Sequence, residues 1–182
     1  MMRKFAVLCV LLLCQMTAWA HKASDSYLTM DITGNAVTVQ WDIALRDIDF
    51  ALDLDRDGNA EITRGELRAR QSDVSAWALS RLTLTRSGVC PLLLTSLQVD
   101  EHTDGGYAVL HLSGVCQGAT GALDLQYRVL FDLVSLHRGL LRQNLDGATH
   151  TTVFSPTSGL VQYGAIQASH WAPFSQYLVE GI

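Results

Sequence analysis

Positive charge is scarce in this sequence of 182 residues, because 13 lysines and arginines stand against 18 aspartates and glutamates, giving a formal net charge of −5. The basic residues form no patch, which argues against a nucleic-acid-binding protein. Local signatures of catalysis are missing too: the sequence has no GxSxG, no phosphate-binding glycine loop and no HExxH. Past residue 20 there is no CxxC and no apolar run approaching the roughly 20 residues of a membrane span. We therefore expect a protein that is not an enzyme and that binds no nucleic acid.

The N-terminus has the features of a secretory signal peptide. Arg3 and Lys4 precede an apolar run at residues 5–13, and residues 18–20, AWA, have the small-x-small form of a signal-peptidase site. Cleavage there would remove 20 of the 182 residues and leave a mature chain of 162 that begins at His21. That length is enough for one domain with a substantial core. We expect an exported, periplasmic protein.

Cysteine content is low and is consistent with export. Cleavage of the signal peptide would remove Cys9 and Cys14 and leave Cys90 and Cys116. Two cysteines in an exported chain most simply form one disulfide, which is our prediction. Two free, buried thiols are the alternative.

Residues 55–66, DRDGNAEITRGE, match the twelve-residue calcium loop of an EF-hand. Ile62 at position 8 supplies the apolar anchor, and Ala60 stands at position 6, where glycine normally makes the sharp turn. A left-handed backbone at a residue with a β-carbon costs roughly 1–2 kcal/mol. We expect Ca²⁺ as the ligand, and an acidic turn that binds no ion is the alternative. The oxygen donors fall at positions 1, 3, 5, 7, 9 and 12, which are Asp55, Asp57, Asn59, Glu61 through its backbone carbonyl, Thr63 and Glu66.

A second frame for this loop begins at Asp53, and it fails at its far end. Position 12 would then be Arg64, a cation where the ion requires a carboxylate, so the frame that begins at Asp55 is favoured. Eight of the 18 acidic residues lie within residues 42–66, against three arginines. This clustering also favours a cation site.

Outside the acidic segment the hydrophobic pattern is typical of strands. Gly34-Asn35 separates two of them and predicts a hairpin, and apolar and polar residues alternate along residues 37–44. We expect an antiparallel β-sandwich of about eight strands, with a helix–loop–helix inserted after the second strand at residues 46–81. The candidate strands are residues 26–33, 36–45, 82–85, 93–99, 107–115, 122–131, 140–144 and 149–154.

The calcium loop lies inside this helical insertion, which is the context that an EF-hand requires. Phe50 and Leu54 fall at helical spacing on the entering side of the loop. An apolar face on the exiting side is made by Leu67, Val74, Trp77 and Ala78. Only one such hand is visible, so the sandwich has to support it.

Three blocks of the sequence resemble the extracytoplasmic region of HupE/UreJ-type proteins. They are HKASDSYL at residues 21–28, LHRGLL at residues 136–141 and, most specific, WDIALRDIDFALDLDRDGNAEITRGEL at residues 41–67. That family is named for hydrogenase-expression and urease-accessory proteins, and some members are regarded as nickel permeases. In the family this region precedes a multi-helix membrane domain. The resemblance covers most of residues 21–182 and implies a membrane domain or membrane partner and a link to metal uptake. From the strand pattern and the change of composition near residue 155, we expect a sandwich over residues 21–155 and a tail at residues 156–182 that leads toward that domain.

Two other functions stay open beside that of an exported calcium-binding domain. The α-amino group and imidazole of a mature N-terminal His21 can chelate Cu(II) or Ni(II), which would make the chain a transition-metal capture module. A purely structural interaction domain is the third hypothesis. A second imidazole for the His21 site would come from His102, His111, His137, His150 or His170.

Overall fold

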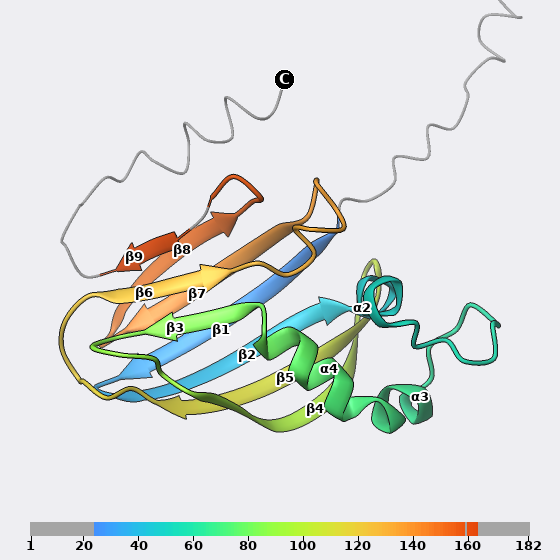
Figure 1. Ribbon diagram of the computed structural model, residues 1–182, viewed down its shortest axis with the longest axis horizontal. Coiled ribbons are helices and arrows are strands. Elements are labelled where there is room, and N and C mark those ends of the chain that lie inside the picture. Colours follow the sequence, from blue (N-terminus) through green and yellow to red (C-terminus); the bar gives the residue numbers. More distant parts are fainter. Residues whose placement is uncertain (1–23, 159, 164–182) are drawn as a thin grey trace, which may run out of the picture.

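The computed structural model describes residues 24–158 and 160–163, and its described part is built mainly of β-strands (Figure 1). The predicted signal peptide, His21 and most of the predicted tail lie outside these residues. The strands are β1 (Asp25–Thr33), β2 (Ala36–Ala44), β3 (Leu82–Thr85), β4 (Leu92–His102), β5 (Gly105–Val115), β6 (Leu123–Tyr127), β7 (Arg138–Leu145), β8 (Ala148–Phe154) and β9 (Leu160–Tyr163). The helices are α2 (Leu45–Leu52), α3 (Arg64–Ala69) and α4 (Gln71–Leu79).

The strands form two sheets that enclose the hydrophobic core. The larger has six strands in the order β4-β5-β2-β1-β7-β8, and the smaller has three in the order β3-β6-β9. Trp41 of the large sheet is completely buried, and its ring centroid lies 5.8 Å from that of Tyr127 in the small sheet. A sandwich with helices after the second strand is therefore confirmed.

One strand pair departs from the antiparallel arrangement that we expected. β1 and β2 form the predicted hairpin around Gly34, which has a positive φ of 58°. On its other side, β1 pairs in parallel with β7, from Asp25 beside Arg138 to Ile32 beside Leu145. The large sheet is therefore mixed, and the fully antiparallel prediction is wrong for this pair. Turn signals predict hairpins between neighbouring strands, but they carry no information on a pairing between strands so distant in sequence.

Several element boundaries also differ from the sequence prediction. The strand expected over residues 122–131 ends at Tyr127, and Leu130 adopts a left-handed φ of 57° in the turns that follow. β9 pairs with β6, so the small sheet continues beyond residue 155, where we expected the sandwich to end. On the entering side of the helical insertion, Leu54 is buried as expected, whereas Phe50 is 66% exposed.

The predicted disulfide is present between Cys90 and Cys116. Cys90 lies just before β4 and Cys116 just after β5, so the bond joins the ends of two paired strands. Both half-cystines are buried. A disulfide of this kind indicates an oxidising compartment, as expected for an exported protein.

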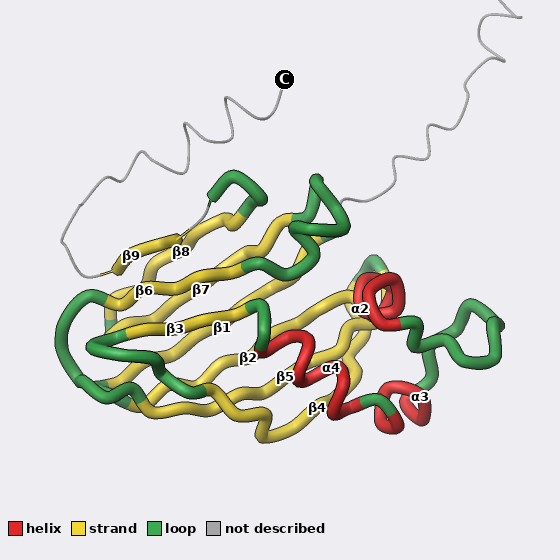
Figure 2. The backbone as a smooth tube through the Cα atoms, viewed as in Figure 1, coloured by secondary structure: helices red, strands yellow, loops and turns green. Residues whose placement is uncertain are grey.

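The helical insertion lies at one end of the sandwich (Figures 1 and 2). α2 follows β2 without a break and packs against β2 and β5, while α4 packs against β3 and β4. Val74 and Ala78 of α4 are completely buried. Residues 53–63 form a loop that projects away from the sheets between α2 and α3 (Figure 2).

Candidate metal site

Three carboxylates meet at the projecting loop. Asp55, Asp57 and Glu66 each offer an oxygen, and these atoms all lie within 4.8 Å of one another. The three residues hold positions 1, 3 and 12 of the predicted calcium loop. The structure thus brings together the acidic side chains at both ends of the motif and defines a group that could hold a metal ion.

Asp55 organises the turn inside the loop. One of its carboxylate oxygens accepts hydrogen bonds from the backbone N–H groups of Gly58 at 2.8 Å and Asn59 at 3.2 Å. The other accepts from the N–H of Ala60 at 2.7 Å. These bonds, that from Ala60 most of all, hold the pKa of Asp55 below its usual value. Asp55 is therefore kept ionised, which is the form that binds cations.

Glu66 closes the loop and begins the next helix. Its carboxylate accepts from the N–H and the hydroxyl of Thr63, both at 2.9 Å, while the Thr63 hydroxyl accepts from the Glu66 N–H at 3.2 Å. This reciprocal pair is a capping box at the start of α3. The N–H of Arg56 also donates to Glu66, at 3.0 Å. The bonds from Thr63 are the main reason why the pKa of Glu66 is lowered.

Asn59 and Thr63 each form hydrogen bonds with one of the three acids. The Asn59 side chain donates to Asp57 at 3.1 Å and accepts from the backbone N–H of Glu61 at 2.7 Å. Thr63 is bonded to Glu66 as above. Asp55, Asp57 and Asn59 therefore form one hydrogen-bonded group, which the backbone N–H of Glu61 joins, while Thr63 and Glu66 form a second.

The acidic group, rather than the backbone angles, supports the frame that begins at Asp55, because Gly58 at position 6 of the rival frame is also left-handed, with a φ of 71°. Ala60 at position 6 has a left-handed φ of 63°, the conformation that usually selects glycine there. Asp53, the start of the rival frame, instead ends α2 with its N–H bonded to the carbonyl of Asp49, and it is not a member of the acidic group. The anchor Ile62 is half-buried and packs against the hydrophobic core.

Two residues that position the loop were not predicted from the sequence. The carboxylate of Asp49 accepts from the N–H groups of Leu54 at 2.7 Å and Asp55 at 2.9 Å, and so fixes the start of the loop on α2. The guanidinium of Arg70 donates to the carbonyls of Leu52 at 3.2 Å and Asp53 at 3.3 Å, which ties the exiting side to the entering helix. Helix-terminal contacts of this kind leave no local sequence signal.

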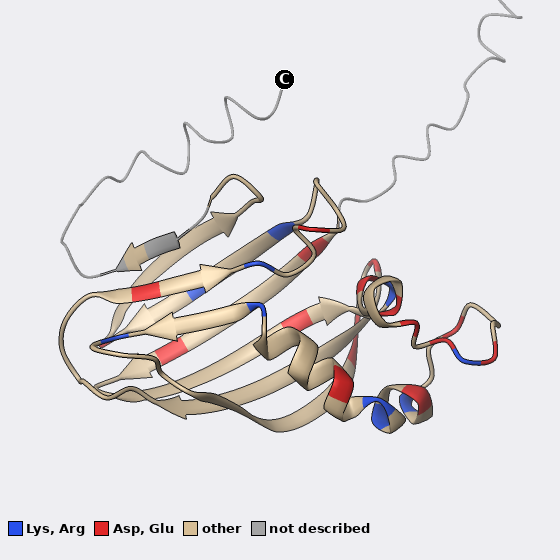
Figure 3. Cartoon of the chain, viewed as in Figure 1, with Lys and Arg blue, Asp and Glu red and all other residues tan. Residues whose placement is uncertain are grey.

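Acidic residues, with a few basic ones among them, gather on the loop and the helix ends beside it (Figure 3). The loop itself is largely exposed, so its carboxylates are accessible to an ion from solution. All side-chain donors of the group are oxygens, the ligands preferred by hard cations such as Ca²⁺ and Mg²⁺. The group contains no histidine or cysteine. Its chemistry therefore differs from that of nickel, copper or zinc sites.

None of the described histidines proposed as partners of His21 belongs to the acidic group. His102 stacks on Tyr107 with ring centroids 4.0 Å apart, and its Nε2 lies 3.5 Å from Asp42. His111 is half-buried in β5, as expected of a structural residue, and His150 is exposed in β8. His137 is completely buried. His170, like His21, lies outside the described residues.

A serine, a histidine and an aspartate do meet elsewhere in the fold, where no local motif predicted them. The Ser24 hydroxyl donates to Asp47 at 2.7 Å and lies 2.6 Å from Nδ1 of His137. In a nucleophilic triad the histidine stands between the serine and the acid. Here the serine stands between them and is itself buried, so this order does not activate a nucleophile.

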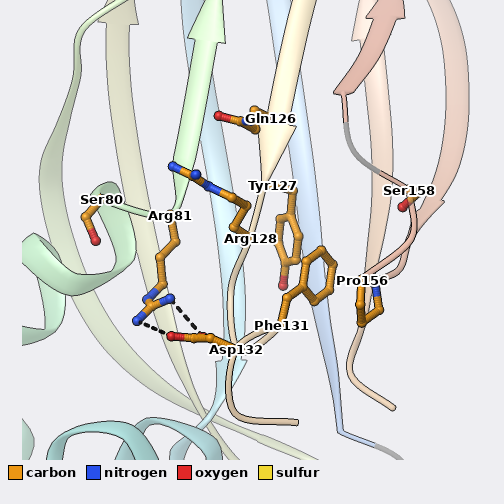
Figure 4. A pocket seen from close by; sticks show the side chains of 9 residues that line it. All are labelled: Ser80, Arg81, Gln126, Tyr127, Arg128, Phe131, Asp132, Pro156 and Ser158. Atoms are coloured by element: carbon orange, nitrogen blue, oxygen red, sulfur yellow. Dashed lines mark hydrogen bonds and ion pairs between the residues drawn. The ribbon is translucent and has the colours of Figure 1, made fainter. Parts of the chain in front are cut away.

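A shallow cavity of about 570 Å³ opens on the side of the small sheet (Figure 4). Arg81 and Asp132 form a two-point ion pair in its wall, with N–O distances of 3.0 and 3.2 Å. Phe131 and Pro156 add apolar surface. The hydroxyl of Tyr127, another lining residue, bonds to Ser26 in the protein interior. The cavity thus offers a polar surface with one of its two arginines already neutralised.

No known family model matches the chain, and a search of curated proteins finds no significant match. Among the described residues, no helix has the length and apolar character needed to cross a membrane. The function therefore has to be argued from the site itself.

Proposed function

We propose that residues 55–66 bind one Ca²⁺ ion and that the chain acts as a non-catalytic, exported calcium-binding domain. The observation that carries this proposal is the convergence of Asp55, Asp57 and Glu66, whose oxygens lie within 4.8 Å of one another at the EF-hand spacing. The capping box and the bond from the Arg56 N–H already hold Glu66 beside the loop, so the carboxylates of positions 1 and 12 are close together before an ion binds. The flanking helices α2 and α3 add the structural context of the motif.

Calcium is favoured over magnesium by the form of the donor set. Ca²⁺ accepts six to eight oxygens in flexible geometry, including a bidentate carboxylate, whereas Mg²⁺ demands near-ideal octahedral geometry and keeps several waters. The proposed set combines side chains of Asp55, Asp57, Asn59, Thr63 and Glu66 with the carbonyl of Glu61. Such a mixed set from one continuous loop fits the larger and less demanding ion.

The proposed role of the ion is structural. Single extracellular sites commonly have a Kd of about 10⁻⁴–10⁻³ M, so the site would be filled in a calcium-rich compartment. A ligand that binds only the folded state at ten times its Kd stabilises it by about 1.4 kcal/mol. Ca²⁺ would thereby fix α3 relative to α2 and hold the insertion on the sandwich.

The proposed cellular setting follows from the disulfide and from the family resemblance. The buried Cys90–Cys116 bond fits an oxidising compartment such as the periplasm. The resemblance to the extracytoplasmic region of HupE/UreJ-type proteins supports a place beside a membrane domain linked to metal uptake. In this setting the domain would serve as a calcium-stabilised support for that partner.

Calorimetric titration of Ca²⁺ into the exported chain tests the proposal. We expect one-to-one binding that weakens at least tenfold, or about 1.4 kcal/mol, in the Glu66→Gln variant. Glutamine also completes a capping box, so α3 is retained while the ligand charge is lost. The matched control is Glu61→Gln, which removes the same charge from the same loop but spares the backbone ligand, and we expect only a small change.

Two outcomes would contradict calcium binding at this loop. One is the absence of heat up to several millimolar Ca²⁺, which would leave a purely structural domain. The other is an equal loss of affinity in Glu66→Gln and Glu61→Gln, which would mean that ions are attracted only by the general negative charge.

A further inference from the structure

Five buried side chains form one continuous hydrogen-bonded chain between the helical insertion and the sandwich. From one end to the other, the links are Asp47 to Ser24 at 2.7 Å, Ser24 to His137 Nδ1 at 2.6 Å, His137 Nε2 to Tyr127 at 2.7 Å and Tyr127 to Ser26 at 2.5 Å. None of the five is more than 9% exposed. Water therefore has little access to replace any of these bonds.

The hydrogen-bonded chain from Asp47 to Ser26 joins segments that are distant in sequence. Asp47 lies on α2, Ser24 directly precedes β1, Ser26 lies in β1, and Tyr127 ends β6. His137 directly precedes β7 and is separated from Ser24 by 113 residues. Because no link lies within one element, the bonds serve to hold α2, β1, β6 and β7 together.

The charge of Asp47 dictates where every proton in this chain lies. An ionised carboxylate only accepts, so the Ser24 hydroxyl must donate to it. Ser24 then has no proton for His137, and Nδ1 of the imidazole must carry the proton that joins them. Nε2 is left as an acceptor, which takes the Tyr127 proton, and Tyr127 in turn accepts from Ser26.

Protonation of Asp47 permits the opposite order without moving any heavy atom. The carboxylic acid can donate to Ser24, Ser24 to Nδ1, and the Nε2–H group to Tyr127, which then donates to Ser26. The histidine changes tautomer, while its overall charge stays zero. We propose that the chain from Asp47 to Ser26 is a proton switch, in which the charge of Asp47 selects the tautomer of the buried His137.

Charged groups near the hydrogen-bonded chain act on each of its three titratable members. On its own helix Arg46 approaches it to 3.7 Å, and Asp104 of the β4–β5 turn acts on it from a distance. The imidazole faces the aromatic ring of Phe131 at 6.0 Å and feels the charge of Arg138. The Tyr127 hydroxyl feels the charges of Asp47 and Asp25.

Burial keeps the histidine neutral over the range in which the switch would act. It lowers the pKa of His137 to about 4, with a smaller contribution from Arg138. The same effect raises the pKa of Asp47 above its usual value, although the bond from Ser24 and the charge of Arg46 oppose it. Burial thus favours the neutral form of both the carboxyl group and the imidazole.

The switch is independent of the proposed calcium site, although both involve α2. Asp47 faces Ser24, whereas Asp49, two residues later, bonds to the start of the loop at Leu54 and Asp55. A failure of calcium binding would leave the hydrogen-bonded chain unchanged.

NMR of the ¹⁵N-histidine-labelled exported chain tests the proposal, because protonated and unprotonated ring nitrogens differ widely in chemical shift. At pH 7 we expect His137 to be in the Nδ1–H form. In the Asp47→Ala variant the terminal acceptor is gone, so Ser24 is free to donate to the imidazole and we expect the Nε2–H form at the same pH. The control is Arg46→Ala on the same helix, which should keep the Nδ1–H form.

An Nε2–H tautomer in the unsubstituted chain at pH 7 would overturn the proposal outright. So would an Nδ1–H tautomer that persists in the folded Asp47→Ala variant. If that variant does not fold, Ser24→Ala replaces it, and the tautomer should then no longer depend on pH between 7 and 4.5. A tautomer change over that range that is the same with and without Ser24 would also refute the switch.

Discussion

Gly139 in β7 offers the sharpest test of the packing around the buried tyrosine. A β-carbon at this position would lie 2.7 Å from Cζ and 2.8 Å from Cε1 of Tyr127, which are distances that real contacts do not tolerate. The ring has no room to retreat, because it stacks on Phe154 with centroids 5.0 Å apart and meets the edge of Phe131 at 5.3 Å. The Gly139→Ala substitution should therefore displace the ring or the strand.

The expected cost combines two effects. Overpacking a tightly packed core by one methyl group costs about 1–3 kcal/mol. A displaced Tyr127 also weakens its bonds to Ser26 and His137, and a buried polar group left unsatisfied costs about 1–3 kcal/mol. We therefore expect Gly139→Ala to lower the free energy of unfolding by roughly 2–6 kcal/mol, a large share of the 5–15 kcal/mol typical of a domain.

Urea unfolding at pH 7, followed by circular dichroism, measures this loss. The control is Gly65→Ala in α3, where the new β-carbon would meet only the Thr63 hydroxyl oxygen at an ordinary 3.6 Å. There alanine should stabilise the helix by about 0.5–1 kcal/mol, so the same substitution has opposite signs at the two sites. An unfolding midpoint unchanged by Gly139→Ala would refute the close packing of the Tyr127 ring against Gly139.

Three further predictions concern the loop, the disulfide and the buried histidine. Ala60→Gly removes the strain of a φ of 63° but adds conformational freedom to the unfolded chain. Thermal unfolding at saturating Ca²⁺ should therefore show a free energy of unfolding that is higher by about 0.5–1 kcal/mol. A lower value would mean that the left-handed turn is not formed. Replacing both Cys90 and Cys116 by serine removes a bond between residues that are 26 positions apart and should lower the free energy of unfolding in urea by about 3–4 kcal/mol. An unchanged unfolding midpoint would mean that the disulfide does not stabilise the fold by constraining the unfolded chain. The pKa of His137 falls from 6.5 to about 4 on folding. The neutral histidine therefore adds roughly 2–4 kcal/mol to the free energy of unfolding above pH 6.5, and this contribution is lost as the pH falls toward 4. Unfolding experiments across this range should show that loss in the unsubstituted chain and a weaker one in His137→Gln.

Features encoded within a few neighbouring residues could be predicted from the sequence. The hairpin at Gly34-Asn35 and the register of the acidic loop each depend on adjacent side chains and backbone angles. The capping box needs only Thr63 and Glu66, three residues apart. The disulfide was predictable because removal of the signal peptide would leave two cysteines and therefore one pairing.

Features that depend on contacts between distant segments could not be predicted. The parallel pairing of β1 with β7 and the buried chain through Ser24, Asp47 and His137 arise only when the sandwich closes. His137 illustrates the limit, because beside Arg138 it resembles an ordinary loop residue in the sequence. Its burial depends on Tyr127 and Ser24, which lie 10 and 113 residues away.

The buried chain also has consequences for how stability depends on pH, because its two titratable ends act in opposite directions. The pKa of Asp47 is raised in the folded state. The favourable contribution of Asp47 to the free energy of unfolding is therefore fully present below the ordinary pKa of 3.8 and is lost as the pH rises through the raised pKa. His137 has a lowered pKa, so its contribution is lost as the pH falls. As the pH falls, the two changes therefore oppose each other. Removal of Asp47 alone should make the fold more sensitive to acid, even though ionised Asp47 is itself costly to bury.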